Sequence, residues 1–103
     1  MCWQKITIWK YPLEICDEQQ LQVPYPSRVL SVGVDAPGAC LWVLVNTENE
    51  KAPMRIRIRG TGHPIESAKD WTYLGHVIQA PFIWHVLAYS EHIRPWLLMG
   101  ERP

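Results

Sequence analysis

The sequence has no excess of charge of either sign. Its 103 residues include ten basic and ten acidic side chains, so the formal net charge is +0 at pH 7. Charged residues make up 19% of the chain, below the roughly 25% of an average globular protein. A protein that binds nucleic acids in general carries a basic surplus, so the composition argues against that function. A neutral small protein also lacks the self-repulsion that keeps copies apart, which favours a homo-oligomer.

Long apolar runs and paired cysteine motifs are also missing. The longest apolar run, Cys40–Val45, has about six residues, whereas a membrane-spanning helix needs roughly 20. The N-terminal segment MCWQKITIWKY contains no apolar stretch typical of a signal peptide. Cys2, Cys16 and Cys40 form no C-x-x-C pair, which argues against a zinc ribbon or redox motif and favours free thiols in a reducing cytosol. We therefore expect a cytoplasmic protein with no membrane partner.

Bulky apolar residues and prolines are abundant instead. Apolar residues make up 48% of the chain, which contains six tryptophans and nine prolines. A disordered chain would be poor in aromatic residues, and a coiled coil would need long runs of Ala, Glu, Lys and Leu. The length matches one domain, at roughly 100–200 residues per domain. The composition therefore predicts one small folded domain with many turns.

Apolar and polar residues alternate with period two along most of the chain, which is the pattern of β-strands. Short runs of this kind, spaced about 8–12 residues apart, are typical of an antiparallel sandwich or barrel. The runs are Lys5–Tyr11, Gln20–Val23, Val29–Val34, Cys40–Val45, Met54–Arg59, Trp71–Ile78 and Phe82–Tyr89. We predict an all-β domain of about six to seven strands over residues 1–89. Trp42 lies within a continuously apolar run, so we expect it in the core.

The segments between these runs have turn chemistry, because proline lacks the backbone donor that a strand needs and glycine tolerates unusual dihedral angles. No stretch shows sustained helical periodicity, and Ile65–Asp70 can form at most one helical turn. Residues 90–103 are apolar for a tail and include Trp96 and Leu97. An extension of this composition should pack on its own domain or on a neighbouring subunit.

Five segments occur in an order that resembles a family of small phage and prophage proteins catalogued as a domain of unknown function. They are Ile8–Leu13, Leu30–Asp35, Leu41–Val45, Gly60–Pro64 and Phe82–Val86. The resemblance covers roughly residues 6–88 and implies a phage accessory protein that acts in the cytoplasm of a bacterial host. Small phage proteins of this kind often counter host immunity. The resemblance brings no catalytic residues with it.

Three arginines form the main candidate for a ligand site. Arg55, Arg57 and Arg59 occupy every second position of one predicted strand, so their guanidinium groups share one face about 6.5–7 Å apart. Each guanidinium can bind two oxygens of a phosphate or carboxylate. The alternative is a solvated outer face, or one paired across strands, where charges contribute little.

A glycine-rich turn and two aromatic positions extend this candidate site. Gly60-Thr61-Gly62-His63 follows the arginine strand directly, and backbone amides in such a turn can bind an anion. The alternative is an ordinary tight turn. Trp84 could stack on a nucleobase and His85 could face a ligand, although both could also be structural. We predict ligand-binding roles for Arg55, Arg57, Arg59, Thr61, His63, Trp84 and His85.

Catalytic and metal sites have no support in the spacing of the residues. The four histidines, which are His63, His76, His85 and His92, do not follow the H-x3-5-H or H-E-x-x-H pattern of zinc sites. Ser67, Asp70 and His85 could form a triad on paper, but no nucleophile elbow accompanies them. We therefore expect no catalytic residues, no metal and no cofactor.

These features favour a binding protein over an enzyme. The first hypothesis is a phage protein that sequesters a nucleotide-type, anionic signalling ligand of host immunity. Its pocket would lie at a subunit boundary, because one small filled core leaves little room for a cavity. The alternative is an anti-CRISPR-like protein that inhibits a host defence complex by direct binding through edge strands and exposed apolar residues. An enzyme acting on a nucleotide or phosphoester ranks third, because no acid–base pair stands out.

Overall fold

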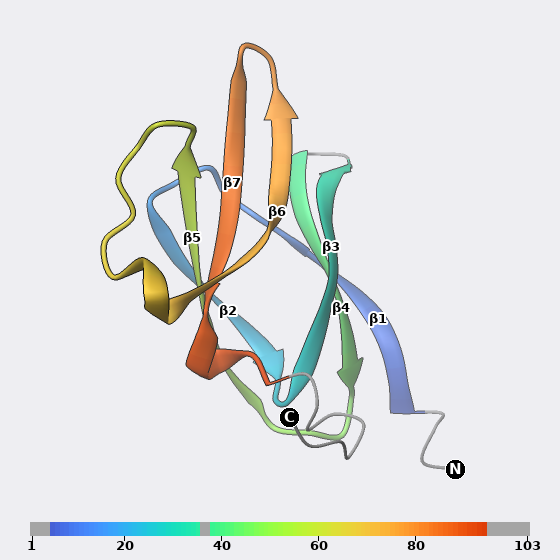
Figure 1. The fold of residues 1–103 in the computed structure, drawn as a ribbon. Coiled ribbons are helices and arrows are strands. Elements are labelled where there is room, and N and C mark those ends of the chain that lie inside the picture. Colours follow the sequence, from blue (N-terminus) through green and yellow to red (C-terminus); the bar gives the residue numbers. More distant parts are fainter. Residues whose placement is uncertain (1–4, 36–37, 95–103) are drawn as a thin grey trace.

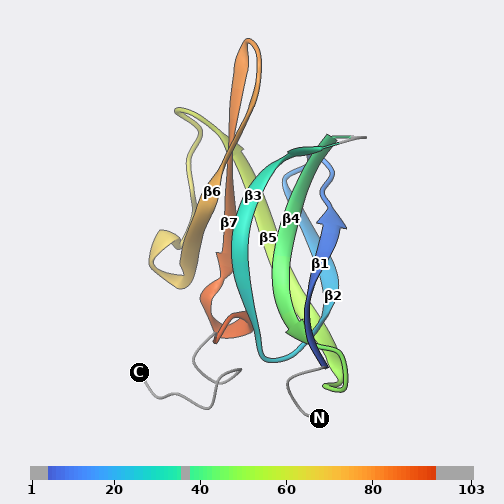
Figure 2. The ribbon, with the colours of Figure 1, turned by 90° about the vertical axis from the view of Figure 1, so that its right-hand side faces the viewer.

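The computed structural model describes residues 5–35 and 38–94 and has an all-β architecture of two antiparallel sheets packed as a sandwich (Figures 1 and 2). All seven predicted runs form strands, each within a residue or a few of its predicted bounds. The strands are β1 (Ile6–Pro12), β2 (Glu18–Pro24), β3 (Ser27–Asp35), β4 (Gly38–Asn46), β5 (Lys51–Gly60), β6 (Trp71–Gln79) and β7 (Phe82–Tyr89). The fold class predicted from period-two alternation is confirmed, and the sandwich settles the choice between sandwich and barrel.

The chain passes repeatedly from one sheet to the other. One sheet has the strand order β1-β4-β3 and the other has the order β2-β5-β7-β6. Consecutive strands β3 and β4 pair directly, as do β6 and β7, whereas β2 pairs with β5 across a long stretch of sequence. The β2–β5 pairing places Glu18 opposite Arg57 and Gln20 opposite Arg55. This non-local pairing decides the surroundings of the arginine row.

The core lies between the central strands of the two sheets. Met54, Ile56 and Ile58 of β5 are buried and belong to the same cluster as Leu41 and Val43 of β4. Because successive side chains of a strand point to opposite faces, burial of these three β5 residues directs the intervening arginines outward. The predicted arginine row therefore exists on the outer face of the four-stranded sheet.

The expectation for Trp42 was wrong. Its neighbours Leu41 and Val43 are fully buried, so period-two alternation turns Trp42 to the outer face of β4. Its side chain is half-buried there against the backbone of Gly33, where a Cβ would lie 3.1 Å from the Trp42 ring. The continuous apolar run reflects an outer face that is partly covered, rather than a strand buried on both sides.

Short 3-10 helices lie outside the sheets. The segment Ala68–Asp70 forms one such turn, within the stretch that we predicted could form one. A second, Ser90–His92, follows β7, and Ile93 after it packs against the core. The beginning of the C-terminal extension thus packs on its own domain, while residues 95–103 lie outside the described residues. No helix of the described ranges is long and apolar enough to cross a membrane.

The thiols of the two described cysteines are free. Cys40 is buried in β4, and Cys16 is partly buried in the loop between β1 and β2. Cys2, the third cysteine of the sequence-based prediction, lies outside the described residues.

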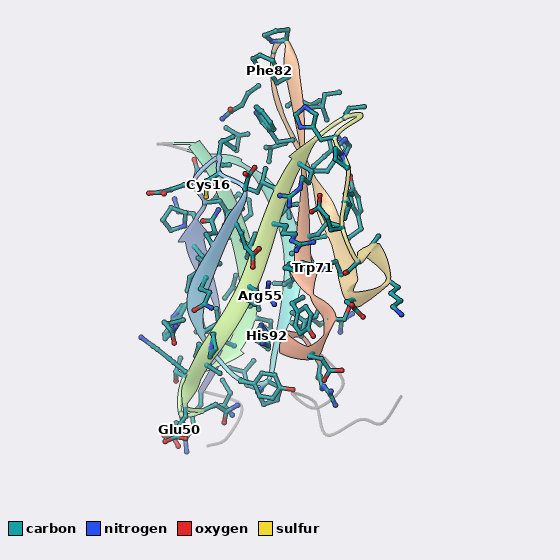
Figure 3. All side chains as sticks on the ribbon, turned by 90° about the vertical axis from the view of Figure 1, so that its left-hand side faces the viewer. Cys16, Glu50, Arg55, Trp71, Phe82 and His92 are labelled. Carbon is teal, nitrogen blue, oxygen red and sulfur yellow. The ribbon has the colours of Figure 1, made fainter. Side chains whose placement is uncertain are left out.

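The β6–β7 hairpin projects beyond the rest of the sandwich (Figure 1). Near its tip, Ile78, Phe82 and Ile83 are 62%, 56% and 41% exposed. Figure 3 shows Phe82 at this end and Glu50 at the opposite end of the molecule. The loop between β1 and β2 and the turn after β5 border the same end, which we call the open end of the sandwich.

Candidate functional site

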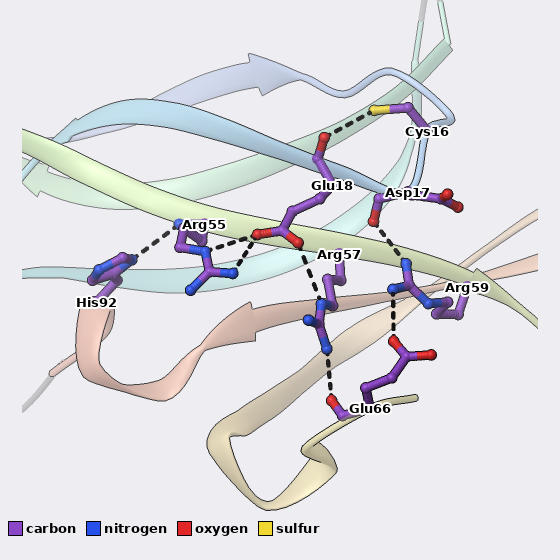
Figure 4. Close-up of polar contacts among 8 residues, drawn as sticks. All are labelled: Cys16, Asp17, Glu18, Arg55, Arg57, Arg59, Glu66 and His92. Carbon is purple, nitrogen blue, oxygen red and sulfur yellow. Dashed lines mark hydrogen bonds and ion pairs between the residues drawn. The ribbon is translucent and has the colours of Figure 1, made fainter. Parts of the chain in front are cut away.

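The outer arginine row begins with Arg55, which has extensive partners (Figures 3 and 4). Its Nε and Nη2 donate hydrogen bonds to Glu18 Oε2 over 2.8 and 2.5 Å. Its guanidinium lies 5.1 Å from the ring centroid of Trp71 and 5.0 Å from that of Tyr89. The backbone N–H of Arg55 donates to Nδ1 of His92 over 3.2 Å. Arg55 is thereby held by one carboxylate and two aromatic rings.

Arg57 and Arg59 attach two loops to the same face. The guanidinium of Arg57 lies 4.1 Å from the Trp71 ring centroid, and its Nη1 donates to the backbone carbonyl of Glu66 over 2.7 Å. Nη1 of Arg59 donates to the carbonyl of Asp17 over 2.7 Å, and Nη2 lies 3.4 Å from Glu66 Oε1. Both arginine side chains are only 13% exposed. The sequence left open a ligand site, a solvated outer face or a face paired across strands. The contacts of Arg55, Arg57 and Arg59 correspond to the face paired across strands.

These contacts also determine the electrostatics of the face. The hydrogen bond from Arg55 to Glu18 keeps the pKa of Glu18 below its ordinary value, and the positive charges of Arg55 and Arg57 act in the same direction. The pKa of Glu66 is lowered by a hydrogen bond from its own backbone and then by Arg59. Burial lowers the pKa of His92, with a further contribution from the charge of Arg55. Such shifts fit a structural ion-pair network that favours the charged carboxylates.

Three adjoining hollows meet at His63 at the open end of the sandwich. The first has a volume of about 340 Å³ and polar walls, the second about 190 Å³ with aromatic walls, and the third about 240 Å³. The first is lined by Asp17, Arg59, His63, Pro64 and Glu66. The second is lined by Gly60, Thr61, His63, Pro81, Phe82, Ile83 and Trp84, and the third by Ile15, Cys16, Asp17, Ile58, Gly60, His63 and Trp84. We call these together the open-end hollow.

Gly60 allows the His63 ring to lie at the centre of this hollow. A Cβ at Gly60 would lie 2.9 Å from His63 Cε1 and 3.4 Å from Trp84 Cζ3, so any larger residue would displace the histidine ring. Gly62 has a φ of +91°, a conformation that side chains other than glycine rarely adopt. The backbone N–H of His63 donates to the carbonyl of Gly60 over 3.0 Å and closes the turn. The two glycines thus have separate roles in one turn.

Trp84 and Phe82 form the aromatic wall. Their ring centroids lie 5.5 Å apart with planes inclined by 31°. Trp84 packs against the core with its inner part, which fixes the wall, while Phe82 stands on the projecting hairpin. A planar ligand group can pack on these exposed ring surfaces, because offset and tilted arrangements are favourable for aromatic pairs.

Thr61, His85 and Tyr73 form a hydrogen-bonded chain on the outer face. Thr61 Oγ1 lies 2.7 Å from His85 Nε2, and Tyr73 Oη lies 2.8 Å from His85 Nδ1. A hydroxyl next to an imidazole resembles a nucleophile with its base. A carboxylate that would fix the imidazole tautomer is replaced by a phenol, which can donate or accept. These hydrogen bonds are thus suited to holding Thr61 and the turn after β5 against β7.

Among the described residues, no group of three or more His, Cys, Asp or Glu side chains is arranged to hold a metal ion.

The comparison with protein families gives a match over residues 4–95. The chain belongs to the family described as a domain of unknown function, DUF7352. This confirms the resemblance to a family of unknown function. Neither the curated proteins nor the solved structures contain a match to the chain.

The DUF7352 region includes all seven strands and every residue that lines the open-end hollow. Of the seven predicted ligand-binding residues, Arg59, Thr61, His63 and Trp84 line the hollow. Arg55 and Arg57 lie farther along the outer face, in the network with Glu18 and Trp71. His85 faces the opposite side of β7 from Trp84 and contacts the turn only through Thr61. The predicted set is thus divided between two regions.

Sequence reasoning missed most of the other residues that line the hollow in this member of DUF7352, among them Asp17, Glu66 and Phe82. Asp17 and Glu66 lie in loops that approach β5 only in the folded chain, and no spacing in the sequence links them to Arg59. The exposure of Phe82 could have been predicted from the sequence. Phe82 directly follows the Gln79–Pro81 turn, and the residues next to a hairpin turn are commonly exposed.

Proposed function

We propose that this protein is a non-catalytic binding protein that sequesters a nucleotide-type ligand in the open-end hollow. One observation carries the proposal: a hollow with an aromatic wall and a hollow lined by an arginine adjoin at one histidine, His63. Nucleotides combine a planar base with an anionic group, and binding sites pair an apolar surface with a few polar groups placed to fix orientation. The hollow provides both at one end of a rigid sandwich.

The size of the hollow supports a ligand that spans more than one of its parts. Sites for small molecules have volumes of roughly 300–1,000 Å³. The aromatic part alone, at about 190 Å³, is smaller than this, whereas the aromatic and polar parts adjoin at His63. Arg59 is paired with His85 and faces outward, so an anionic group linked to a base on Phe82 and Trp84 would reach it by passing His63. His63 would lie between them, within reach of both parts.

The biological role in the proposal comes from the sequence resemblance to small phage proteins. We propose that the ligand is a signal of host antiviral immunity and that binding takes place in the cytoplasm of a bacterial host. Sequestration requires only tight binding, so a site without an activated nucleophile or metal would be sufficient. A homo-oligomer, favoured by the neutral charge, would present several such hollows in one particle.

Isothermal titration calorimetry tests the proposal directly. The full chain is titrated with cyclic di- and trinucleotides, ADP-ribose derivatives and mononucleotides at high protein concentration. We expect at least one of them to bind, His63→Ala to weaken its binding and His76→Ala to leave it unchanged. His76 is the matched control because it is exposed on the outer face of β6, away from the hollow. Absence of heat with every ligand would refute the proposal.

A second candidate function is direct binding of a host defence protein through the β6–β7 hairpin. The observation that favours it is the exposure of Ile78, Phe82 and Ile83 on one projecting element. Large apolar side chains grouped on a protruding hairpin are suited to form the centre of a protein interface. Ile78→Ser distinguishes the two functions, because Ile78 does not line the hollow. It should abolish recovery of a stoichiometric host protein and leave nucleotide binding intact.

A further inference from the structure

The polar part of the open-end hollow has an unusual balance of charge for a nucleotide site. It is lined by one arginine, Arg59, and by two acidic residues, Asp17 and Glu66. With His63 neutral these groups carry one net negative charge, and with His63 protonated their charges cancel. A ligand with several phosphates would therefore meet two carboxylates with little positive charge to compensate, and juxtaposed like charges are unfavourable.

Arg59 has few donors left for an anion. Its Nη1 already donates to the backbone carbonyls of Asp17 and Ile58, over 2.7 and 3.1 Å. Its Nη2 makes only a 3.4 Å contact with Glu66 Oε1, and Glu66 is well exposed. A guanidinium held in this way can offer its Nη2 edge to one anionic group, in exchange for the long contact with Glu66. One phosphate is the most that the arrangement can satisfy.

The two carboxylates line the same polar hollow, one on each side of Arg59 (Figure 4). Arg59 contacts Asp17 through the backbone carbonyl, and the Asp17 side chain extends away from that contact (Figure 4). Within residues 5–35 and 38–94, no hydrogen bond or ion pair engages the Asp17 carboxylate. Glu66 Oε1 makes the long contact with Arg59, and the Glu66 carboxylate also accepts a hydrogen bond from its own backbone N–H. Ionised carboxylates only accept hydrogen bonds, so their complement in a ligand is a group with several donors, such as neighbouring hydroxyls.

We infer that the ligand is a ribonucleoside or a ribonucleotide with a single phosphate. Its base packs on Phe82 and Trp84, its ribose hydroxyls donate to Asp17 and Glu66, and one anionic group faces Nη2 of Arg59. This inference rests on the proposed function and narrows it to a class of ligand. Cyclic dinucleotides and nucleoside triphosphates, which carry more negative charge, fit the same surroundings less well.

Calorimetry with matched ligands tests the inference. The full chain is titrated with the four ribonucleosides, their 5′-monophosphates, the 2′-deoxy monophosphates and the triphosphates. We expect one base to bind, its 2′-deoxy form to bind roughly tenfold more weakly, and its triphosphate to bind no more tightly than the monophosphate. The double variant Asp17→Asn, Glu66→Gln should reduce the preference for ribose over deoxyribose. Both residues are exposed, and the carbonyl contacts with Arg57 and Arg59 come from the backbone.

The possible failures of the inference and of the proposed function differ. Equal affinity for ribose and deoxyribose ligands, or affinity that rises with each added phosphate, would overturn the inference and retain a nucleotide-binding protein. Binding of cyclic oligonucleotides alone would have the same meaning. If no nucleotide of any kind binds, the inference and the proposed function are both wrong.

Discussion

The outer arginine face and the open-end hollow share strand β5, yet their polar groups are used differently. On the outer face Arg55 and Arg57 are enclosed by Glu18, Trp71, Tyr89 and a backbone carbonyl. At the open end His63 and Phe82 are exposed, and the contact between Arg59 and Glu66 is long. Three arginines on one strand are therefore not one site. All three hold loops or strands to this face, but only the third, Arg59, also lines the open-end hollow.

The difference shows how to distinguish a structural arginine from a binding one. A guanidinium that already has a carboxylate and an aromatic ring as partners loses those contacts if it turns to a ligand. Arg59 keeps its two carbonyl partners through Nη1, and its Nη2 has only a long contact with the exposed Glu66 carboxylate, so turning Nη2 to a ligand costs less. The comparison predicts that variants of the outer face change stability and variants of the open end change affinity.

The largest expected effect is on stability, from Arg57→Ala. The substitution removes the stacking on Trp71, the hydrogen bond to the Glu66 carbonyl and the buried stem of the side chain. We expect the free energy of unfolding to fall by about 2 kcal/mol, measured by urea denaturation. Arg28→Ala is the control, because Arg28 is exposed on β3 and its loss should cost at most about 0.5 kcal/mol. Equal stability of the two variants would contradict a structural role for Arg57.

The outward position of Arg57 could be predicted from the sequence, but its partners could not. Period two along Met54–Arg59 is a local property, so alternation alone assigns inner and outer faces. Glu18 becomes a partner only because β2 pairs with β5, which are separated in the sequence by β3 and β4. Trp71 reaches Arg57 through β6, at the far edge of the same sheet. Strand order is a global property, and no short motif indicates it.

Only part of the open-end hollow could be predicted from the sequence. The glycine turn and the strand that carries Trp84 follow from local chemistry, and both were placed correctly. Trp84 and His85 are adjacent in one strand, so they face opposite sides, and only one of them could line the hollow. The prediction that Trp42 lies in the core was wrong for a related reason. An apolar run does not reveal how completely the outer face of the strand is covered.

The next effect in size is on affinity, from Gly60→Ala. The added methyl group would lie 2.9 Å from Cε1 of His63, so the exposed histidine ring must move out of the centre of the hollow. We expect ligand binding to weaken roughly tenfold, equivalent to about 1.4 kcal/mol, with little change in stability. Gly38→Ala is the matched control, because a Cβ there meets no atom of the described structure within 4 Å. If both variants bind as the wild type does, the position of His63 is unimportant.

The smallest effect concerns the pH dependence of stability, and it arises in the outer arginine face. His92 accepts a hydrogen bond from the Arg55 backbone, and burial holds its pKa below the ordinary value near 6.5. The unfolded chain therefore takes up this proton first, so stability falls as the pH drops below about 6.5. The depressed pKa of Glu18 adds a second loss below its ordinary value near 4.5. Each contribution is fully present above the ordinary pKa of its group.

Unfolding curves measured between pH 8 and pH 3 resolve these two windows. The variant His92→Gln should flatten the stability profile between about pH 7 and 5, and Glu18→Gln should flatten it below about pH 4.5. The Glu18 ion pairs are partly exposed, so screening limits their contribution to roughly 0.5 kcal/mol. Glu50→Gln is the control, since Glu50 is exposed at the opposite end of the molecule from the hollow. A profile with the wild-type slope in all three variants would show that the outer face does not respond to acid, and its ion pairs would then be as dispensable as those of an ordinary solvated surface.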